Sequence, residues 1–94
     1  MADMYTLLEI KKFQISEDQG GEFYIPNERT SWSAVSHKSS MISYNEKIKE
    51  LKENGGHSLI IRFNMTKQKI THITEVLNGE VVTKSVPAKT VARW

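Results

Sequence analysis

Residues 70–86, ITHITEVLNGEVVTKSV, decide the fold. Two runs rich in β-branched residues flank Asn78-Gly79, and this pair favours a two-residue type I′ turn because both central positions need positive φ. A hairpin closed on that turn has a fixed register, which pairs Leu77 with Glu80, Val76 with Val81, Glu75 with Val82 and Thr74 with Thr83. Strict alternation then predicts two faces. One carries Ile70, Val76 and Val81, and the other carries Ile73, Leu77, Val82, Glu75 and Lys84.

The segment before this hairpin, residues 57–65, is predicted to be another strand. It reads HSLIIRFNM and alternates with period two, so that one face is fully apolar. That face holds Leu59, Ile61, Phe63 and Met65. The opposite face is mixed, and residues 66–69 form a polar turn into the hairpin.

A helix is predicted over residues 43–54. Ser43 is a good N-cap, and Glu46 three residues later completes a capping box. The apolar residues recur at i, i+4 and i+7, namely Tyr44, Ile48 and Leu51. Asn54-Gly55-Gly56 supplies the C-terminal stop. We expect this amphipathic helix to lie on the sheet that follows it.

The N-terminal half is less regular. Residues 4–15 fit either a strand or a helix, and we favour a strand because aromatic and β-branched residues recur there. Residues 16–21 read as a turn, and residues 22–25 as a short strand that ends before Pro26 and forms a hairpin with the first. Residues 27–42 show little periodicity and are interpreted as a long connection with at most a short turn of helix. Residues 87–94 are either a last edge strand or a mobile basic tail.

These elements predict a single small domain of the α+β class. It would have an antiparallel sheet of four or five strands with one amphipathic helix, in the order β-β-α-β-β-β. The chain has 94 residues, a length typical of one domain.

Composition restricts the chemistry. The chain has no cysteine, which excludes disulfides, thiolate chemistry and cysteine-based metal sites, and favours a cytoplasmic location. We expect neither a signal peptide nor a transmembrane helix, since no sufficiently long apolar run occurs. Residues 1–33 carry three Lys or Arg against six Asp or Glu, whereas residues 34–94 carry ten against five. This asymmetry indicates a basic face that could attract an acidic partner.

No motif specifies an enzyme. Residues 30–43, TSWSAVSHKSSMIS, offer serines beside His37, but no G-x-S-x-G turn is present. His37, His57 and His72 are not at metal-ligand spacing, and His72 is expected to be a half-buried packing residue on a strand. Serines at the helix start beside Lys38 could form a weak anion site. We therefore expect no catalytic residue, no metal and no cofactor.

The function expected from the sequence is binding. We predict a non-enzymatic protein that regulates or inhibits a partner protein through surface contacts, as small accessory proteins of bacteria and phages do. Tryptophan is enriched at interface hot spots, although Trp32 and Trp94 could each equally pack on the core. The candidate partner-binding residues are Trp32, His37, Lys38, Lys84, Lys89, Arg93 and Trp94. An exposed sheet edge would also permit strand addition or a homodimer.

The alternative hypothesis is a nucleic-acid-binding protein. A sheet face with a basic rim and interspersed aromatic residues can follow a phosphate backbone and stack bases. Its candidate residues are Arg62, Lys67, Lys69 and Lys84.

Overall fold

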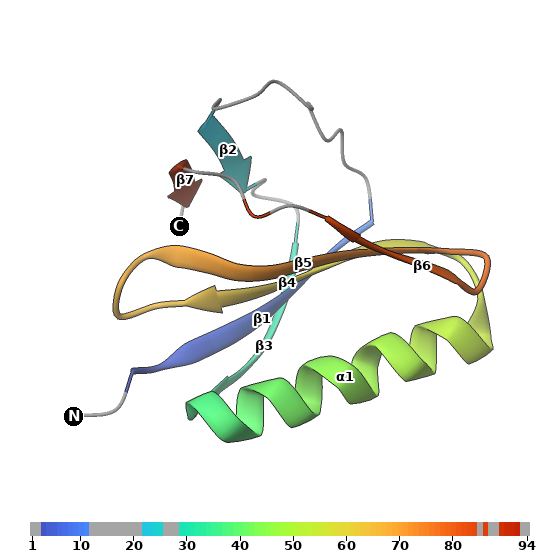
Figure 1. Ribbon diagram of the computed structural model, residues 1–94, viewed down its shortest axis with the longest axis horizontal. Coiled ribbons are helices and arrows are strands. Elements are labelled where there is room, and N and C mark those ends of the chain that lie inside the picture. The colour runs from blue at the N-terminus through green and yellow to red at the C-terminus, as the bar shows by residue number, and fades with distance from the viewer. Residues whose placement is uncertain (1–2, 12–21, 26–28, 85, 87–88, 93–94) are drawn as a thin grey trace.

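The computed structural model describes residues 3–11, 22–25, 29–84, 86 and 89–92. Its elements are β1 Tyr5–Ile10, β2 Glu22–Ile25, β3 Thr30–Val35, α1 His37–Asn54, β4 His57–Asn64, β5 Lys69–Leu77, β6 Glu80–Lys84 and β7 Lys89–Ala92. Five strands form an antiparallel sheet in the order β3-β1-β4-β5-β6. Helix α1 covers one side of this sheet, and the parallel pair β2–β7 lies on the other side (Figure 1). The predicted α+β class is confirmed.

The hairpin of β5 and β6 has the predicted register. Leu77 pairs with Glu80, and the pairing continues without interruption to Ile73 opposite Lys84. Asn78 and Gly79 have φ values of 50° and 87°, the left-handed conformation that the turn requires. Local turn chemistry was sufficient to fix this part of the sheet.

The predicted faces of β5 were wrong at Ile70, because β5 contains a bulge. The register shifts between Arg62 and Phe63 of β4, which pair with His72 and Ile70. Thr71 is therefore an extra residue in β5, and the alternation restarts after it. As a result Ile70 joins Ile73 in one cluster, on the face away from α1, rather than sharing a face with Val76.

Helix α1 begins two turns earlier than predicted. Its N-cap is Ser36, whose side chain accepts a hydrogen bond from the Ser39 backbone N–H, so the predicted N-cap Ser43 lies inside the helix. The C-terminal end is as predicted, with Gly55 at φ 75° donating its backbone N–H to the Leu51 carbonyl. The helix therefore has 18 residues.

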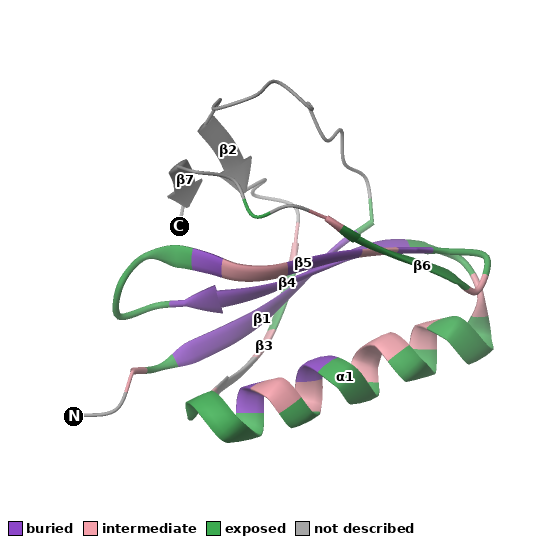
Figure 2. Cartoon of the chain, in the orientation of Figure 1, coloured by how far each residue is buried: buried purple, intermediate pink, exposed green. Residues whose placement is uncertain are grey.

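The helix packs on the mixed face of β4, not on its fully apolar face. Tyr44 of α1 forms a cluster with Leu7 and Ile60, against which Ile48 and Leu51 also pack. The fully apolar face lies on the opposite side of the sheet. The buried apolar cluster on that side of the sheet consists of Leu8, Ile10, Leu59, Ile61, Phe63, Ile70 and Ile73. Strand β4 is thus buried on both faces, as its purple colour in Figure 2 shows.

The N-terminal connections differ from the prediction. Residues 5–10 form a strand as expected, but β1 pairs with β3 and β4, and β2 pairs in parallel with β7. The expected β1–β2 hairpin is therefore wrong. The supposed connection over residues 27–42 contains β3 and the start of α1. The predicted turn at residues 16–21 lies outside the described residues. In the tail, residues 89–92 form a strand.

Candidate functional site

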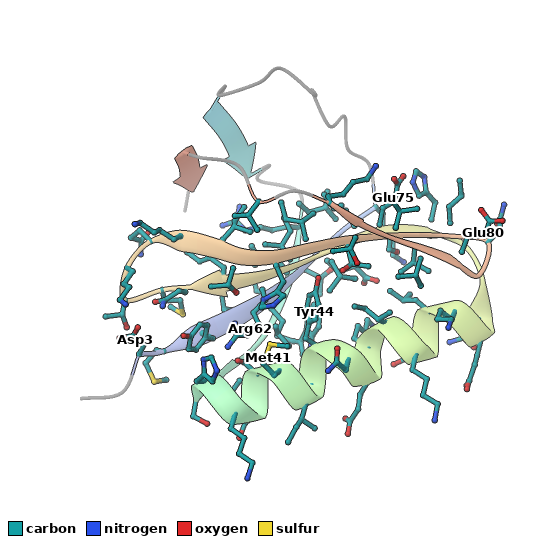
Figure 3. The ribbon with its side chains drawn as sticks, viewed as in Figure 1. Asp3, Met41, Tyr44, Arg62, Glu75 and Glu80 are labelled. Carbon is teal, nitrogen blue, oxygen red and sulfur yellow. The ribbon has the colours of Figure 1, made fainter. Side chains whose placement is uncertain are left out.

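Arg62 occupies an unusual position for a charged residue. It lies at the middle of the sheet on β4, and the first two turns of α1 cover it, so that only 1% of its surface is exposed. Figure 3 shows its side chain between the helix and the sheet, close to Met41 and Tyr44. The alternation of β4 places it there, because Ile60 and Arg62 share the side that faces α1.

Every nitrogen of the Arg62 guanidinium donates to at least one acceptor. Nε donates to the Ser40 hydroxyl at 2.8 Å. Nη1 donates to Thr71 Oγ1 at 2.9 Å and faces His72 Nδ1 at 3.4 Å. Nη2 contacts His37 Nδ1 at 3.1 Å and donates to the His37 carbonyl oxygen at 3.2 Å. Three elements, α1, β4 and β5, are thereby joined at one side chain. We call Arg62 and these four partners the Arg62 cluster.

Among the described residues, no carboxylate forms an ion pair with Arg62. The ring of Tyr5 lies 4.0 Å from the guanidinium carbon, in cation–π geometry. The remaining contacts are lone pairs of hydroxyl, carbonyl and imidazole groups. Guanidinium carries only donors, so these groups contact it through their lone pairs.

His72 is electrostatically sensitive. Burial lowers its pKa below the usual 6.5, and the nearby charges of Arg62 and His37 lower it further. A proton on Nδ1 would point a donor at a donor and add a positive charge beside Arg62. His72 is half-buried on a strand, as predicted, but it is also a hydrogen-bonding member of the Arg62 cluster.

Two features explain why the Arg62 cluster could not be predicted from the sequence. The bulge at Thr71 turns two consecutive residues, Thr71 and His72, toward Arg62, whereas a regular strand would send them to opposite faces. Ser40 is fully buried, and its hydroxyl also donates to the His37 carbonyl at 2.7 Å. The Ser40 hydroxyl thus contacts a guanidinium and a carbonyl, and it forms no serine–histidine nucleophile pair with the described histidines.

Tyr44 extends the polar contacts beneath α1. Its hydroxyl donates to the Ile60 carbonyl at 3.3 Å and lies 2.7 Å from Thr74 Oγ1. Burial raises the pKa of Tyr44 to about 12, so the phenol stays neutral. Together with the Arg62 cluster, it fixes how the helix sits on the sheet.

The second notable region is the free edge of the sheet. Strand β6 has no outer neighbour among the described strands. Seven large hydrophobic residues are exposed in the described part of the chain, and four of them belong to the β5–β6 hairpin or lie just after it. These four are Leu77, Val81, Val82 and Val86. We call this region the β6 edge, and its strand is green along most of its length in Figure 2.

An ion-pair network lies beside the β6 edge. Glu75 of β5 contacts His57 Nε2 at 2.6 Å and Lys84 Nζ at 3.2 Å. These two contacts lower the pKa of Glu75, the hydrogen bond with His57 more than that with Lys84. Figure 3 shows Glu75 on the side of the sheet away from α1, and Glu80 at the start of β6. Lys84 is thus held on the face that also carries Val82.

Those predicted partner-binding residues whose side chains are described lie in different parts of the fold. Trp32 is half-buried and packs against the cluster around Tyr44, with Lys47 Nζ 5.6 Å from its ring centroid. His37 and Lys38 are exposed at the start of α1, and His37 also belongs to the Arg62 cluster. Lys84 lies in β6. Lys89 is in β7, where only the backbone is described, and Arg93 and Trp94 lie outside the described residues.

The predicted nucleic-acid-binding residues do not form one surface. Arg62 is buried and is absent from any exposed rim. Lys67 and Lys69 are exposed around the β4–β5 turn, and Lys67 Nζ lies 3.6 Å from Asp3. That pair and a hydrogen bond from Asn64 lower the pKa of Asp3, the Asn64 bond being the larger cause.

Within the described ranges, no group of three or more acidic or histidine side chains is placed to hold a metal ion. No described helix has the length and apolar character to span a membrane. Comparison with known proteins found no matching family model, no matching curated protein and no matching solved structure.

Proposed function

We propose that this chain is a non-enzymatic, intracellular protein-binding module that regulates or inhibits a partner by contact along the β6 edge. The observation that carries this proposal is the concentration of exposed apolar residues at the β6 edge. Isolated exposed hydrophobic residues are ordinary, but a group of them on one edge is typical of an interaction site. The cysteine-free composition supports the proposed compartment.

Strand addition is the mode of binding that this edge supports. An edge strand offers unpaired backbone N–H and C=O groups, which an extended segment of a partner can bond. Proteins often block such edges with a bulge, a proline or charged side chains, lysine above all. Strand β6 pairs with β5 without a bulge, and its charged residues, Glu80 and Lys84, lie at its two ends. The central residues Val81, Val82 and Thr83 leave the edge open to pairing.

The Arg62 cluster supports the proposal indirectly. It ties α1 to the centre of the sheet through buried hydrogen bonds, which makes a rigid support for the β6 edge. A preorganised strand loses less conformational entropy on binding than a mobile one. On this view the buried polar residues stabilise the scaffold, and the exposed apolar residues contact the partner.

The test is selection of binding peptides from a random library displayed against sparsely immobilised protein. We expect enrichment of extended, β-branched sequences whose binding is lost in Val82→Lys. Ile42→Lys is the matched control, because Ile42 is an exposed β-branched residue on α1, 52% exposed against 47% for Val82. Peptides that bind Val82→Lys as well as they bind the wild type, or no enrichment at all, would overturn the proposal.

Nucleic-acid binding is the weaker alternative. Three of its four candidate cations are on or near the surface, but Lys67 and Lys84 each face a carboxylate. Lysines that replace counter-ions on a phosphate backbone must leave such partners. A gel-shift titration with mixed DNA and RNA at low salt decides the matter. Binding that weakens steeply with added salt would favour this alternative over strand addition.

A further inference from the structure

We propose that a second copy of this chain binds at the β6 edge, so that two β6 strands pair antiparallel about a two-fold axis at Val82. The inference rests on the proposed role of the β6 edge and names a partner for it. The two five-stranded sheets would then form one continuous sheet of ten strands. Three observations support this choice of partner.

The first observation is which backbone groups of β6 face outward. The residues that flank a two-residue hairpin loop, Leu77 and Glu80, exchange both of their backbone hydrogen bonds. In an antiparallel pair such exchanges recur at every second residue, so Val82 and Lys84 also bond to β5. The N–H and C=O groups of Val81 and Thr83 therefore point to the open side. Any strand that adds to β6 must bond at these two residues.

The second observation is that the sequence of β6, EVVTK, is complementary to itself in the antiparallel direction. When Val81 of one copy pairs with Thr83 of the other, both residues of the pair have outward-facing backbone N–H and C=O groups. The two such pairs together form four backbone hydrogen bonds across the axis. Val82 then lies opposite Val82 of the second copy. Glu80 lies opposite Lys84 of the second copy, and the same pair occurs again on the other side of the axis.

This register also gives the best side-chain pairs. The Glu80–Lys84 and Val82–Val82 pairs occupy non-hydrogen-bonded positions, where opposed side chains come closest. Glu80 has no ion pair with any described residue, while Lys84 is already positioned by Glu75. A shift of the register by one hydrogen-bonded step would place Val82 opposite Glu80 or Lys84 and would lose both charge pairs. The sequence therefore selects a single alignment.

The third observation is that the two edges of the sheet differ. At the opposite edge, β3 has an irregular register with β1 between Tyr5 and Leu7. A bulge of this kind bends and twists an edge strand and hinders further pairing. Strand β6 pairs regularly along all five of its residues. Of the two edge strands of the described five-stranded sheet, only β6 therefore offers a copy of the chain a regularly paired edge.

The interface is small, so we expect a weak dimer. A contact of five residues on each chain falls at the low end of specific interfaces, with a dissociation constant on the order of 10 to 100 µM. Dimerisation would therefore depend on concentration. At low concentration the β6 edge would be open to other proteins, and self-pairing would compete with them.

Sedimentation equilibrium tests the proposal, with wild-type protein measured from about 1 µM to about 1 mM. The wild type should rise from the monomer mass of 10.8 kDa toward twice that mass. Glu80→Lys should dimerise at least tenfold more weakly than the wild type, because its charges at positions 80 and 84 are then all positive. Ile42→Lys is the control, and we expect it to dimerise like the wild type.

A charge-exchange experiment tests the register. Lys84→Glu alone should also dimerise weakly, but an equimolar mixture of Glu80→Lys and Lys84→Glu should form a heterodimer, since opposite charges then meet at both pairs. This recovery cannot come from a misfolded chain, although Lys84→Glu loses its contact with Glu75. Failure of the mixture to associate, or unchanged dimerisation of either single variant, would overturn the proposed pairing.

The two proposals fail in different ways. A wild-type chain that stays monomeric at about 1 mM overturns self-pairing. If peptides selected on the wild-type protein nevertheless fail to bind Val82→Lys, strand addition to another protein stands. If the dimer forms but no peptide is selected, self-pairing stands and the proposed function is overturned.

Discussion

Arg62 and Val82 reverse the usual relation between residue type and burial. The arginine is 1% exposed, whereas the valine is 47% exposed. Arg62 lies on β4, which has a neighbouring strand on each side and a helix above it, and five hydrogen-bond contacts converge on its guanidinium. Val82 lies on β6, which has no outer neighbour among the described strands. The position of a strand in the sheet thus decides burial more strongly than residue type does.

The difference also separates two roles. A buried charge is tolerated only where its hydrogen bonds are complete, so the Arg62 cluster has to be rigid and specific. An exposed valine on an edge has little effect on the stability of the monomer and gains most when another chain covers it. We therefore expect substitutions in the Arg62 cluster to affect folding, and substitutions at the β6 edge to affect association.

The largest effect is expected for Arg62→Ala. The substitution leaves a cavity and removes the donor from acceptors on α1 and β5, so the free energy of unfolding should fall by about 3–5 kcal/mol. Urea unfolding followed by circular dichroism measures this loss. Lys69→Ala, which removes an exposed cation from the same sheet, should change stability by less than about 0.5 kcal/mol. Equal stability of the two variants would contradict a structural role for Arg62.

Tyr44→Phe should have the next largest effect. It removes a buried hydroxyl that contacts the Ile60 carbonyl and Thr74, so we expect a loss of about 1–2 kcal/mol in the free energy of unfolding. Tyr5→Phe is the matched control, because the Tyr5 hydroxyl makes a single, partly exposed contact, with His37 at 3.3 Å. A greater loss in Tyr5→Phe would show that the Tyr44 contacts contribute little.

A smaller effect is expected on acidification. The pKa of His72 is lower in the folded protein than its ordinary 6.5, so the unfolded chain binds more protons at mildly acidic pH. Stability should be highest above pH 6.5 and fall as the pH drops below it. Asp3 and Glu75, with lowered pKa values, should reduce stability further only below their ordinary values of 3.8 and 4.5. Arg62 contacts His72 from the neighbouring strand β4, Tyr44 contacts it across the helix–sheet interface, and His37 adds to its electrostatic environment.

His72→Asn isolates this effect, because an amide oxygen can replace the Nδ1 acceptor without titrating. Chemical unfolding of both chains between pH 7 and pH 5 should give a flatter pH dependence for the variant. His57→Asn is the control, since His57 pairs with Glu75 at a distant, exposed position. An unchanged slope in His72→Asn would mean that the Arg62 cluster does not restrain the protonation of His72.

The smallest effect on folding is expected at the β6 edge. Val82→Lys should change the free energy of unfolding of the dilute monomer by no more than about 0.5 kcal/mol, because the side chain is half exposed already. Thermal unfolding at low concentration measures this change. A loss comparable to that in Tyr44→Phe would place Val82 in the core of the monomer and would remove the contrast with Arg62.

The sequence predicted the elements that depend on local chemistry. The turn Asn78-Gly79 fixed the register of β5 and β6, and Gly55 marked the end of α1. The stripe of Tyr44, Ile48 and Leu51 correctly identified the face of α1 that packs on the sheet. In each case residues near one another in the chain carry the information.

The parts that were missed depend on contacts between distant residues. Ser40 faces the sheet because Arg62 binds it, so apolar periodicity could not show that α1 begins before Ser43. The bulge at Thr71 has no glycine or proline to mark it, and it alone brings Thr71 and His72 together at Arg62. Three of the six residues of strand β3 are Ser or Thr, and its pairing with β1 spans a long stretch of chain. The Arg62 cluster consequently has no linear motif.

Backbone amide hydrogen exchange at β6 tests the central claim most directly. We expect the amides of Val82 and Lys84 to be protected at every concentration, because they bond to β5. The amides of Val81 and Thr83 should exchange freely in dilute protein and become protected as the concentration rises, and Glu80→Lys should abolish that protection. Rapid exchange at Val81 and Thr83 in dilute and concentrated protein alike would contradict pairing of two β6 strands.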